Sequence, residues 1–202
     1  GVSYLPSEAL EFFGNISQNY RSVTFSDIRT INPSFQVDPD ISDEDGYTAD
    51  AGIRGIVGKL AYSANVFALQ YNDRLGEVLT PEVRIRADGT EVQTGRIIRR
   101  RGNIGAAFIY GLESLLEWNL LNDKSAGGQP YSLIAFANTS LTQSKYTDSK
   151  IAGIKDNEVE FIPLVNLKTG LRFGYGNLLG SFQYSYLSNQ FTDASNAPQD
   201  QA

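Results

Sequence analysis

The sequence contains no cysteine, no histidine and no methionine, and the first two absences exclude several kinds of chemistry. Without cysteine there are no disulfides and no thiol nucleophiles, and without either residue there are no Cys/His metal sites. The lack of histidine also removes His-containing catalytic triads and His general bases. Because the chain opens without an initiator methionine and ends in the polar stretch 197–202, we interpret it as an internal segment of a longer protein.

A long apolar run and an excess of basic residues are missing as well. No run approaches the roughly 18 apolar residues of a membrane-spanning helix, and residues 133–137 form one of the longest. Lys and Arg number 17 against 23 Asp and Glu, which sets the formal net charge at −6. A general nucleic-acid-binding protein needs a basic footprint, so we expect no nucleic-acid partner. Glycine, tyrosine and phenylalanine are abundant, and they favour strands and turns.

Polar and apolar residues alternate with a period of two along most of the chain, which indicates β-strands with one apolar face. Residues 106–121 show the pattern most clearly. In 60–73 and 131–145 apolar residues fall on both sides, so the phase is ambiguous there. We predict seven strands, over 8–20, 46–56, 60–73, 106–121, 131–145, 159–175 and 178–191.

The connections between these segments alternate between long and short. Residues 21–45, 74–105 and 146–158 are long connections, whereas 57–59 and 176–177 are tight turns. Loops beyond about 12–15 residues are uncommon in compact domains, but outer-membrane barrels have tight periplasmic turns and long external loops. The pattern predicts an all-β, antiparallel up-and-down meander that is part of an outer-membrane barrel. A soluble antiparallel sheet with one wet face produces the same alternation and stays open as an alternative.

In the barrel interpretation the two faces have different surroundings. A polar lumen suits the charged residues of the strands, since lipid does not tolerate them; these are Asp50, Arg54, Glu113, Glu117, Lys168 and Arg172. An aromatic girdle is expected near the short turns, where the sequence has Tyr62, Trp118, Tyr131 and Tyr175.

Several stretches, in this order and spacing, resemble TonB-dependent outer-membrane receptors, in particular ferric-citrate-like iron transporters of Bacteroidetes type. They are residues 17–29, 46–50, 67–76, 103–113, 138–142, 159–163 and 190–194. The resemblance implies a 22-stranded barrel filled by an N-terminal plug, preceded by a TonB box and a signal peptide. Residues 1–202 are then one partial barrel domain without the plug and the terminal strands, and the two longest loops are the seventh and eighth external loops, which close over the ligand in ferric-citrate receptors.

Six arginines in the predicted 74–105 loop form the clearest charge cluster: Arg84, Arg86, Arg96, Arg99, Arg100 and Arg101. Guanidinium groups donate bidentate hydrogen bonds to carboxylates, so we expect the cluster to bind an anionic ferric chelate. Pairing with lipopolysaccharide or with neighbouring loop carboxylates is the alternative. The acidic stretch 38–45 fits no EF-hand spacing, and we expect it to be a solvated loop. Glu113 and Glu117 lie about 13 Å apart on a strand, too far for a glycosidase pair.

These patterns favour a transport receptor in the outer membrane of a Gram-negative bacterium. Its expected partners are a ferric chelate such as a siderophore or citrate, TonB through the missing plug, and outer-membrane lipid with lipopolysaccharide. No cofactor or resident metal is expected. A passive porin or an adhesin-like surface β-protein is the alternative function. No constellation of residues supports an enzyme.

Overall fold

The computed structural model describes residues 1–30, 32–126 and 128–197, and the polar stretch 198–202 lies outside the described residues. Eight strands form one sheet in chain order, and each strand pairs antiparallel with the next. They are β1 (Val2–Ser7), β2 (Leu10–Arg21), β4 (Glu44–Val57), β5 (Leu60–Ile85), β6 (Glu91–Ala126), β7 (Gln129–Asp148), β8 (Val165–Tyr175) and β9 (Leu178–Leu187). The predicted all-β antiparallel meander is therefore confirmed.

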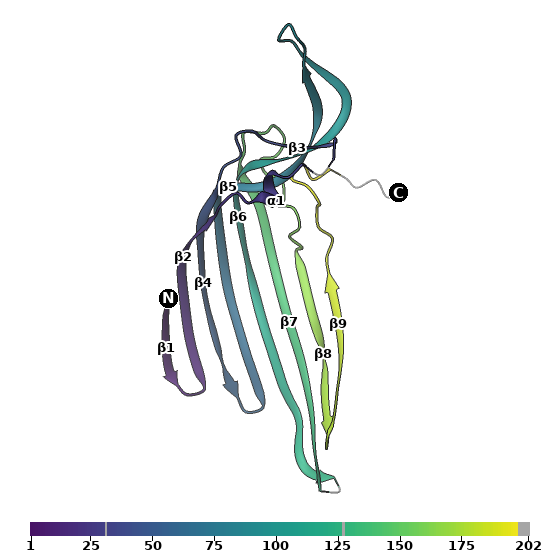
Figure 1. Cartoon of the computed structure of the whole chain (residues 1–202). Coiled ribbons are helices and arrows are strands. Elements are labelled where there is room, and N and C mark those ends of the chain that lie inside the picture. Colours follow the sequence, from purple (N-terminus) through teal and green to yellow (C-terminus); the bar gives the residue numbers. More distant parts are fainter. Residues whose placement is uncertain (31, 127, 198–202) are drawn as a thin grey trace.

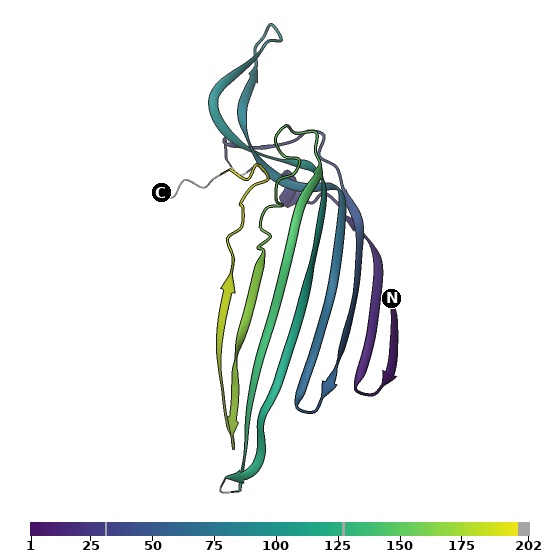
Figure 2. The ribbon, with the colours of Figure 1, turned by 180° about the vertical axis from the view of Figure 1, so that it is seen from behind.

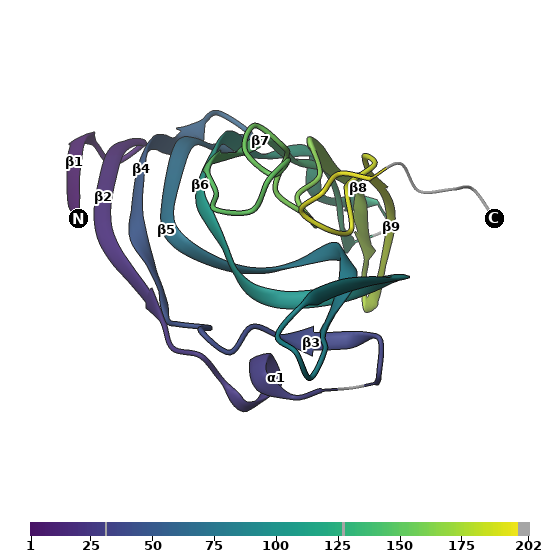
Figure 3. The same ribbon diagram turned by 90° about the horizontal axis from the view of Figure 1, so that it is seen from above.

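Short turns gather at one end of the sheet and the long connections at the other (Figures 1 and 2). Gly58 and Gly176 lie in two of these turns with φ of 60° and 57°, a left-handed conformation that glycine adopts without a steric penalty. Seen from above, the sheet is curved and open, with β1 and β9 at its two edges (Figure 3). The described strands thus form an arc of a wide barrel wall, and the number of strands in the whole barrel stays a prediction.

The register assigns each side chain to a face. Glu11 lies opposite Arg54, and Asn15 lies opposite Asp50. The same face continues through Glu113 and Glu117 of β6 to Lys168 and Arg172 of β8. The opposite face carries large exposed apolar side chains, among them Ile16, Leu112, Trp118, Phe173 and Phe182. The predicted division into a polar and an apolar face holds from β2 to β9.

The buried core lies at the loop end of the sheet, on its polar, concave face (Figure 3). Segments 149–164 and 188–197 fold over the upper parts of β5, β6 and β7. Ile154, Val159 and Ala194 from these segments pack against Ala107 and Tyr146. Phe67, Leu69 and Tyr71 of β5 pack against the same cluster. This cover explains why the phase of 60–73 is ambiguous in the sequence. Apolar residues of this strand occur on the polar face as well, because the cover buries part of that face.

Two strands and two strand ends differ from the prediction. Strands β1 and β3 (Phe35–Val37) were not predicted, and β3 pairs in parallel with Arg99–Arg101 of β6. The predicted strand 159–175 begins only at Val165, because Val159 and Glu160 belong to the loop cover, where both are buried. The predicted strand 178–191 ends at Leu187, where the chain turns into that cover.

The largest correction concerns residues 74–105, which are not a loop. Strands β5 and β6 continue through them and pair as far as Ile85 and Glu91. The resulting hairpin projects beyond the rest of the molecule (Figure 1), and we call its outer part, residues 80–98, the arm. A turn at Asp88-Gly89 closes it. Gly89 has φ of 83°, and Thr90 donates from its backbone N and its Oγ1 to Asp88 Oδ1 at 2.9 and 2.6 Å.

Candidate functional site at the loop end of the sheet

The run Arg99–Arg101 lies at the foot of the arm, where β3 pairs with β6. Each of the three guanidinium groups binds a carboxylate of this chain. Arg99 Nη1 is 3.0 Å from Glu77 Oε2, and Arg100 Nη2 is 2.7 Å from Asp38 Oδ2. Arg101 donates from Nε to Asp27 Oδ1 at 3.0 Å and from Nη1 to Glu77 Oε1 at 3.3 Å. The run therefore ties the 22–43 segment to β5 and β6.

Asp27 is the centre of this network and is only 1% exposed. It lies in α1 (Phe25–Ile28), a single helical turn whose N-cap is Thr24. Thr24 donates from its backbone N at 2.9 Å and from Oγ1 at 2.6 Å, and Arg21 Nη2 donates at 2.8 Å. Burial opposes ionisation of this carboxyl, but the hydrogen bonds from Thr24, Arg101 and Arg21 outweigh it and hold the pKa of Asp27 well below its usual range.

Arg84, Arg86 and Arg96 lie on the arm, apart from the run at its foot. Arg84 Nη2 is 3.2 Å from Glu82 Oε1. Glu82 is nearly buried and also accepts from Thr94 Oγ1 at 2.6 Å; this hydrogen bond, with the neighbouring arginines, lowers the pKa of Glu82. The side chains of Arg86 and Arg96 form no ion pair or hydrogen bond with the part of the chain that the structure describes.

The two sides of the arm differ in character. Val83 pairs with Gln93 and Ile85 with Glu91, whereas Arg84 pairs with Val92 and points to the opposite side. Ile85 is 73% exposed. One side of the arm thus mixes apolar Val83 and Ile85 with polar Gln93 and Glu91, and the other side carries Arg84.

The acidic stretch 38–45 is less solvated than predicted. Asp38 binds Arg100, Asp43 accepts hydrogen bonds from Tyr20 and from the Val23 backbone, and Glu44 is buried. The hydrogen bond from Tyr20, followed by that from Val23, lowers the pKa of Asp43. Within the described residues no group of three or more Asp or Glu side chains is arranged to hold a metal ion. These carboxylates serve the loop network instead.

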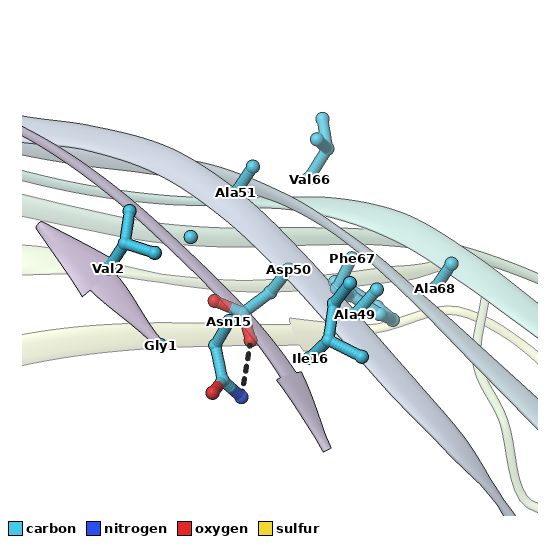
Figure 4. Close-up of a pocket in the computed structure, with 11 residues that line it drawn as sticks. Gly1, Val2, Asn15, Ile16, Ala49, Asp50, Ala51, Val66, Phe67 and Ala68 are labelled. Carbon is cyan, nitrogen blue, oxygen red and sulfur yellow. Dashed lines mark hydrogen bonds between the residues drawn. The ribbon is translucent and has the colours of Figure 1, made fainter. Parts of the chain in front are cut away.

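The apolar face of the sheet has a shallow pocket of about 620 Å³ between β1, β2, β4 and β5 (Figure 4). Small residues form its floor, among them Gly14, Ala49, Ala51 and Ala68, and Val2, Ile16 and Val66 border it. Asn15 and Asp50, which are hydrogen-bonded at 3.4 Å, belong to the polar face. The pocket offers apolar contact and little polar chemistry. No helix among the described residues is long and apolar enough to span a membrane.

Comparison with known proteins identifies the family. Residues 1–202 match the family described as TonB dependent receptor-like, beta-barrel. The chain belongs to this family. The resemblance to TonB-dependent receptors found in the sequence is therefore confirmed, whereas its narrower part, the ferric-citrate subgroup, stays a prediction. No curated protein matches the chain.

Solved structures show the same fold. The chain superimposes on the copper transporter OprC with a TM-score of 0.66 and 13% identity, over 95% of this chain and 27% of OprC. It superimposes on the FrpB iron transporter from Neisseria meningitidis (F3-3 variant) with a TM-score of 0.52 and 14% identity, over 91% of this chain and 25% of FrpB. The chain thus spans about a quarter of the length of either protein, and at these identities the likeness concerns the fold.

Sequence reasoning found the arginines of this site and gave neighbouring loop carboxylates as an alternative partner, but it did not assign those carboxylates. Asp27 and Glu77 lie outside the arginine cluster in the sequence, and isolated acidic residues carry no motif. One available signal was Asp88-Gly89 between alternating apolar residues, a strong hairpin pattern. Another was the capping sequence Thr24-x-x-Asp27.

Proposed function

We propose that the chain forms part of the barrel wall of an outer-membrane receptor that takes up a ferric chelate in a TonB-dependent manner. Membership of the TonB-dependent receptor-like family is the observation that carries this proposal. The names of the two structural neighbours, a copper transporter and an iron transporter, support metal uptake as the activity. TonB would act through a plug domain, and we infer a transport receptor rather than an enzyme.

The dimensions of the apolar face support a position in a bilayer. Phe108 and Tyr110 stack at 5.5 Å near its upper limit, and Trp118 lies near the lower one. The ten steps from Phe108 to Trp118 rise by about 33 Å along a strand. At a strand tilt of about 40° from the membrane normal, this rise spans about 25 Å of the membrane. Outer-membrane barrels have an apolar band of about 25 Å between aromatic girdles. Tyr62, Tyr131 and Tyr175 lie on the same face as Trp118, and Tyr131 and Tyr175 lie nearer the short turns than Trp118 does.

The arm and its foot are the proposed contact with the anionic chelate, a siderophore or ferric citrate, through Arg84, Arg86, Arg96, Arg99, Arg100 and Arg101. These arginines differ in whether their guanidinium groups already bind a carboxylate of the same chain. Arg86 and Arg96 are exposed and bind no carboxylate among the described residues, so their guanidinium groups are free to donate. The other four must share or exchange an internal carboxylate to reach a ligand. Contact with outer-membrane lipopolysaccharide is the competing use of the two free arginines.

The test measures the affinity of the full-length receptor for ferric citrate in detergent at two salt concentrations. The double variant R86Q/R96Q removes two free cations without breaking the network at the foot of the arm. Charged hydrogen bonds contribute about 1.5–3 kcal/mol each, so we expect at least a tenfold loss of affinity. The variant K150Q/K155Q removes the same charge from the exposed 149–164 segment and serves as the control.

An affinity that is unchanged in R86Q/R96Q, or reduced equally in K150Q/K155Q, would assign the arm arginines to another partner. The triple variant R99Q/R100Q/R101Q should weaken binding by at least tenfold as well, but it also loosens the 22–43 segment. Uptake by cells that lack TonB separates the receptor from a passive porin, because a porin keeps its transport rate there.

A further inference from the structure

A polar pocket of about 310 Å³ lies at the foot of the arm, outside residues 80–98, and Arg101 of the arginine run is part of its lining. Its charged lining comes from five parts of the chain: Arg21, Glu44, Arg74, Glu77, Arg101 and Glu160. Three of these six residues are arginines and three are glutamates, and Asp27 also binds both Arg21 and Arg101. The pocket is therefore not electropositive, and an anionic ligand gains no net attraction in it.

Some polar atoms at this pocket form no hydrogen bond with the described residues. Arg74 Nε is buried and forms no hydrogen bond, and Arg74 Nη2 is 4.0 Å from Glu160 Oε1. Glu160 accepts from the buried Tyr146 hydroxyl at 2.7 Å through Oε2 only. Glu44 accepts from the Leu75 backbone N at 2.7 Å, again through one oxygen. One buried donor, Arg74 Nε, is thus unused, although buried polar groups are nearly always hydrogen-bonded. One oxygen of Glu44 and one of Glu160 accept no hydrogen bond from the described residues.

The pocket has an aromatic rim. Phe161 lines it and is 56% exposed. Its φ of 60° is rare for a bulky residue, and a hydrogen bond from its backbone N to the carbonyl of Phe191, at 2.8 Å, holds this conformation. Unusual backbone conformations of this kind cluster at binding sites. An exposed phenyl ring beside unused donors and acceptors offers both a flat apolar face and polar contacts to a ligand.

Gly76 gives the pocket its depth. A Cβ at this position would lie 2.5 Å from Glu160 Oε1 and 2.9 Å from Ile104 Cγ1. The glycine therefore permits Glu160 to approach the β5 backbone and to keep one oxygen facing the pocket.

We propose that this pocket binds an uncharged, hydroxyl-rich group of the size of one sugar ring. A hydroxyl both donates and accepts, so neighbouring hydroxyls can donate to Glu44 and Glu160 and accept from Arg74. The apolar face of the ring lies on Phe161. A charge-balanced lining without a metal-binding group suits such a neutral ligand better than an anion or a metal ion. This site shares only Arg101 with the proposed chelate contacts, and it takes a different chemistry.

The test is saturation-transfer NMR on the full-length receptor in a detergent without sugar headgroups. The probes are glucose, galactose, mannose and N-acetylglucosamine, with citrate as the charged comparison. We expect at least one sugar to receive saturation and citrate not to displace it. The variants F161A and E160Q should each raise the dissociation constant of that sugar at least tenfold. F25A removes a phenyl group that is also exposed, outside the pocket, and should leave it unchanged.

Absence of saturation transfer to all four sugars, or equal affinity in F161A and the native receptor, would overturn the proposal. The pocket would then be interpreted as a water-filled one. Displacement of the sugar by citrate would overturn the proposal too, because the pocket would then belong to the chelate site. R86Q/R96Q should lower only ferric-citrate affinity and F161A only sugar affinity, so failure of one proposal is distinguishable from failure of the other.

Discussion

Replacement of Asp27 by asparagine should release the 22–43 segment from the foot of the arm. The carboxylate accepts from Thr24, Arg21 and Arg101 at once. An amide keeps one acceptor oxygen but loses the charge and the second oxygen. Hydrogen bonds to charged groups contribute about 1.5–3 kcal/mol. Arg21 and Arg101 remain 41% and 21% exposed, so solvent offsets part of this loss. We expect the free energy of local opening to fall by about 2 kcal/mol.

Amide hydrogen exchange of the full-length receptor measures this opening, since exchange rates follow the local opening equilibrium. A loss of about 2 kcal/mol corresponds to exchange about 30-fold faster over residues 22–43, with the β2–β4 pairing unaffected. D40N is the matched control, because Asp40 is an exposed aspartate of the same segment whose carboxylate binds nothing in the described chain. Equal exchange in D27N and the native receptor, or equal acceleration in D40N, would refute the proposed role of Asp27.

The lowered pKa of Asp27 predicts that the local stability of the 22–43 segment depends on pH. Because the pKa of Asp27 is lowered in the folded state, its stabilisation is complete above the unfolded value of about 3.9 and is lost as the pH falls further towards the folded value. Protection of 22–43, corrected for intrinsic exchange, should therefore be weaker at pH 3 than at pH 6. In D27N this difference should disappear, and a difference that persists would assign it to another group.

Three further outcomes follow from the packing. G76A should destabilise the receptor by about 1–3 kcal/mol and accelerate proteolysis within 149–164, because the new methyl group would lie 2.5 Å from Glu160 Oε1; unchanged proteolysis would contradict this. Y146F should cost about 1–3 kcal/mol in thermal or denaturant unfolding, since it removes a 2.7 Å hydrogen bond to a buried carboxylate, and a neutral result would show that water replaces the hydroxyl. The double variant E117Q/R172Q should change the same unfolding free energy by less than about 1 kcal/mol, because both partners are exposed; a larger loss would indicate a partner on the polar face.

Local patterns predicted seven of the nine described strands, although not the extension of β5 and β6 through 74–105. Alternation in β2, β4 and β6 predicts which residues share a face, because successive side chains of a strand point to opposite sides whatever the rest of the chain does. The tight turns at Gly58 and Gly176 can also be predicted locally, because their positive φ depends on the glycine itself. In β5 the same method is ambiguous, because a cover from 149–164 and 188–197 packs on Phe67, Leu69 and Tyr71 of the polar face. In β7 the polar face itself carries Ile134 and Phe136, opposite Arg172 and Gly170 of β8.

The candidate site depends on contacts that no local pattern contains. Arg101 meets Asp27 from 74 positions away, and Arg100 meets Asp38 from 62. The sequence identifies a cluster of six arginines, but it does not show that four of them bind carboxylates of the same chain while Arg86 and Arg96 stay unpaired among the described residues.

By itself, then, the sequence determined the sheet, its two faces and the family, because each follows from spacing and residue type within short stretches. Only the tertiary structure decided that residues 74–105 form a projecting arm and that Arg21, Arg74 and Arg101 meet three glutamates around one pocket. The reason is physical: strand pairing and side-chain alternation act between near neighbours, whereas a guanidinium group binds whichever carboxylate the folded chain brings within about 3 Å.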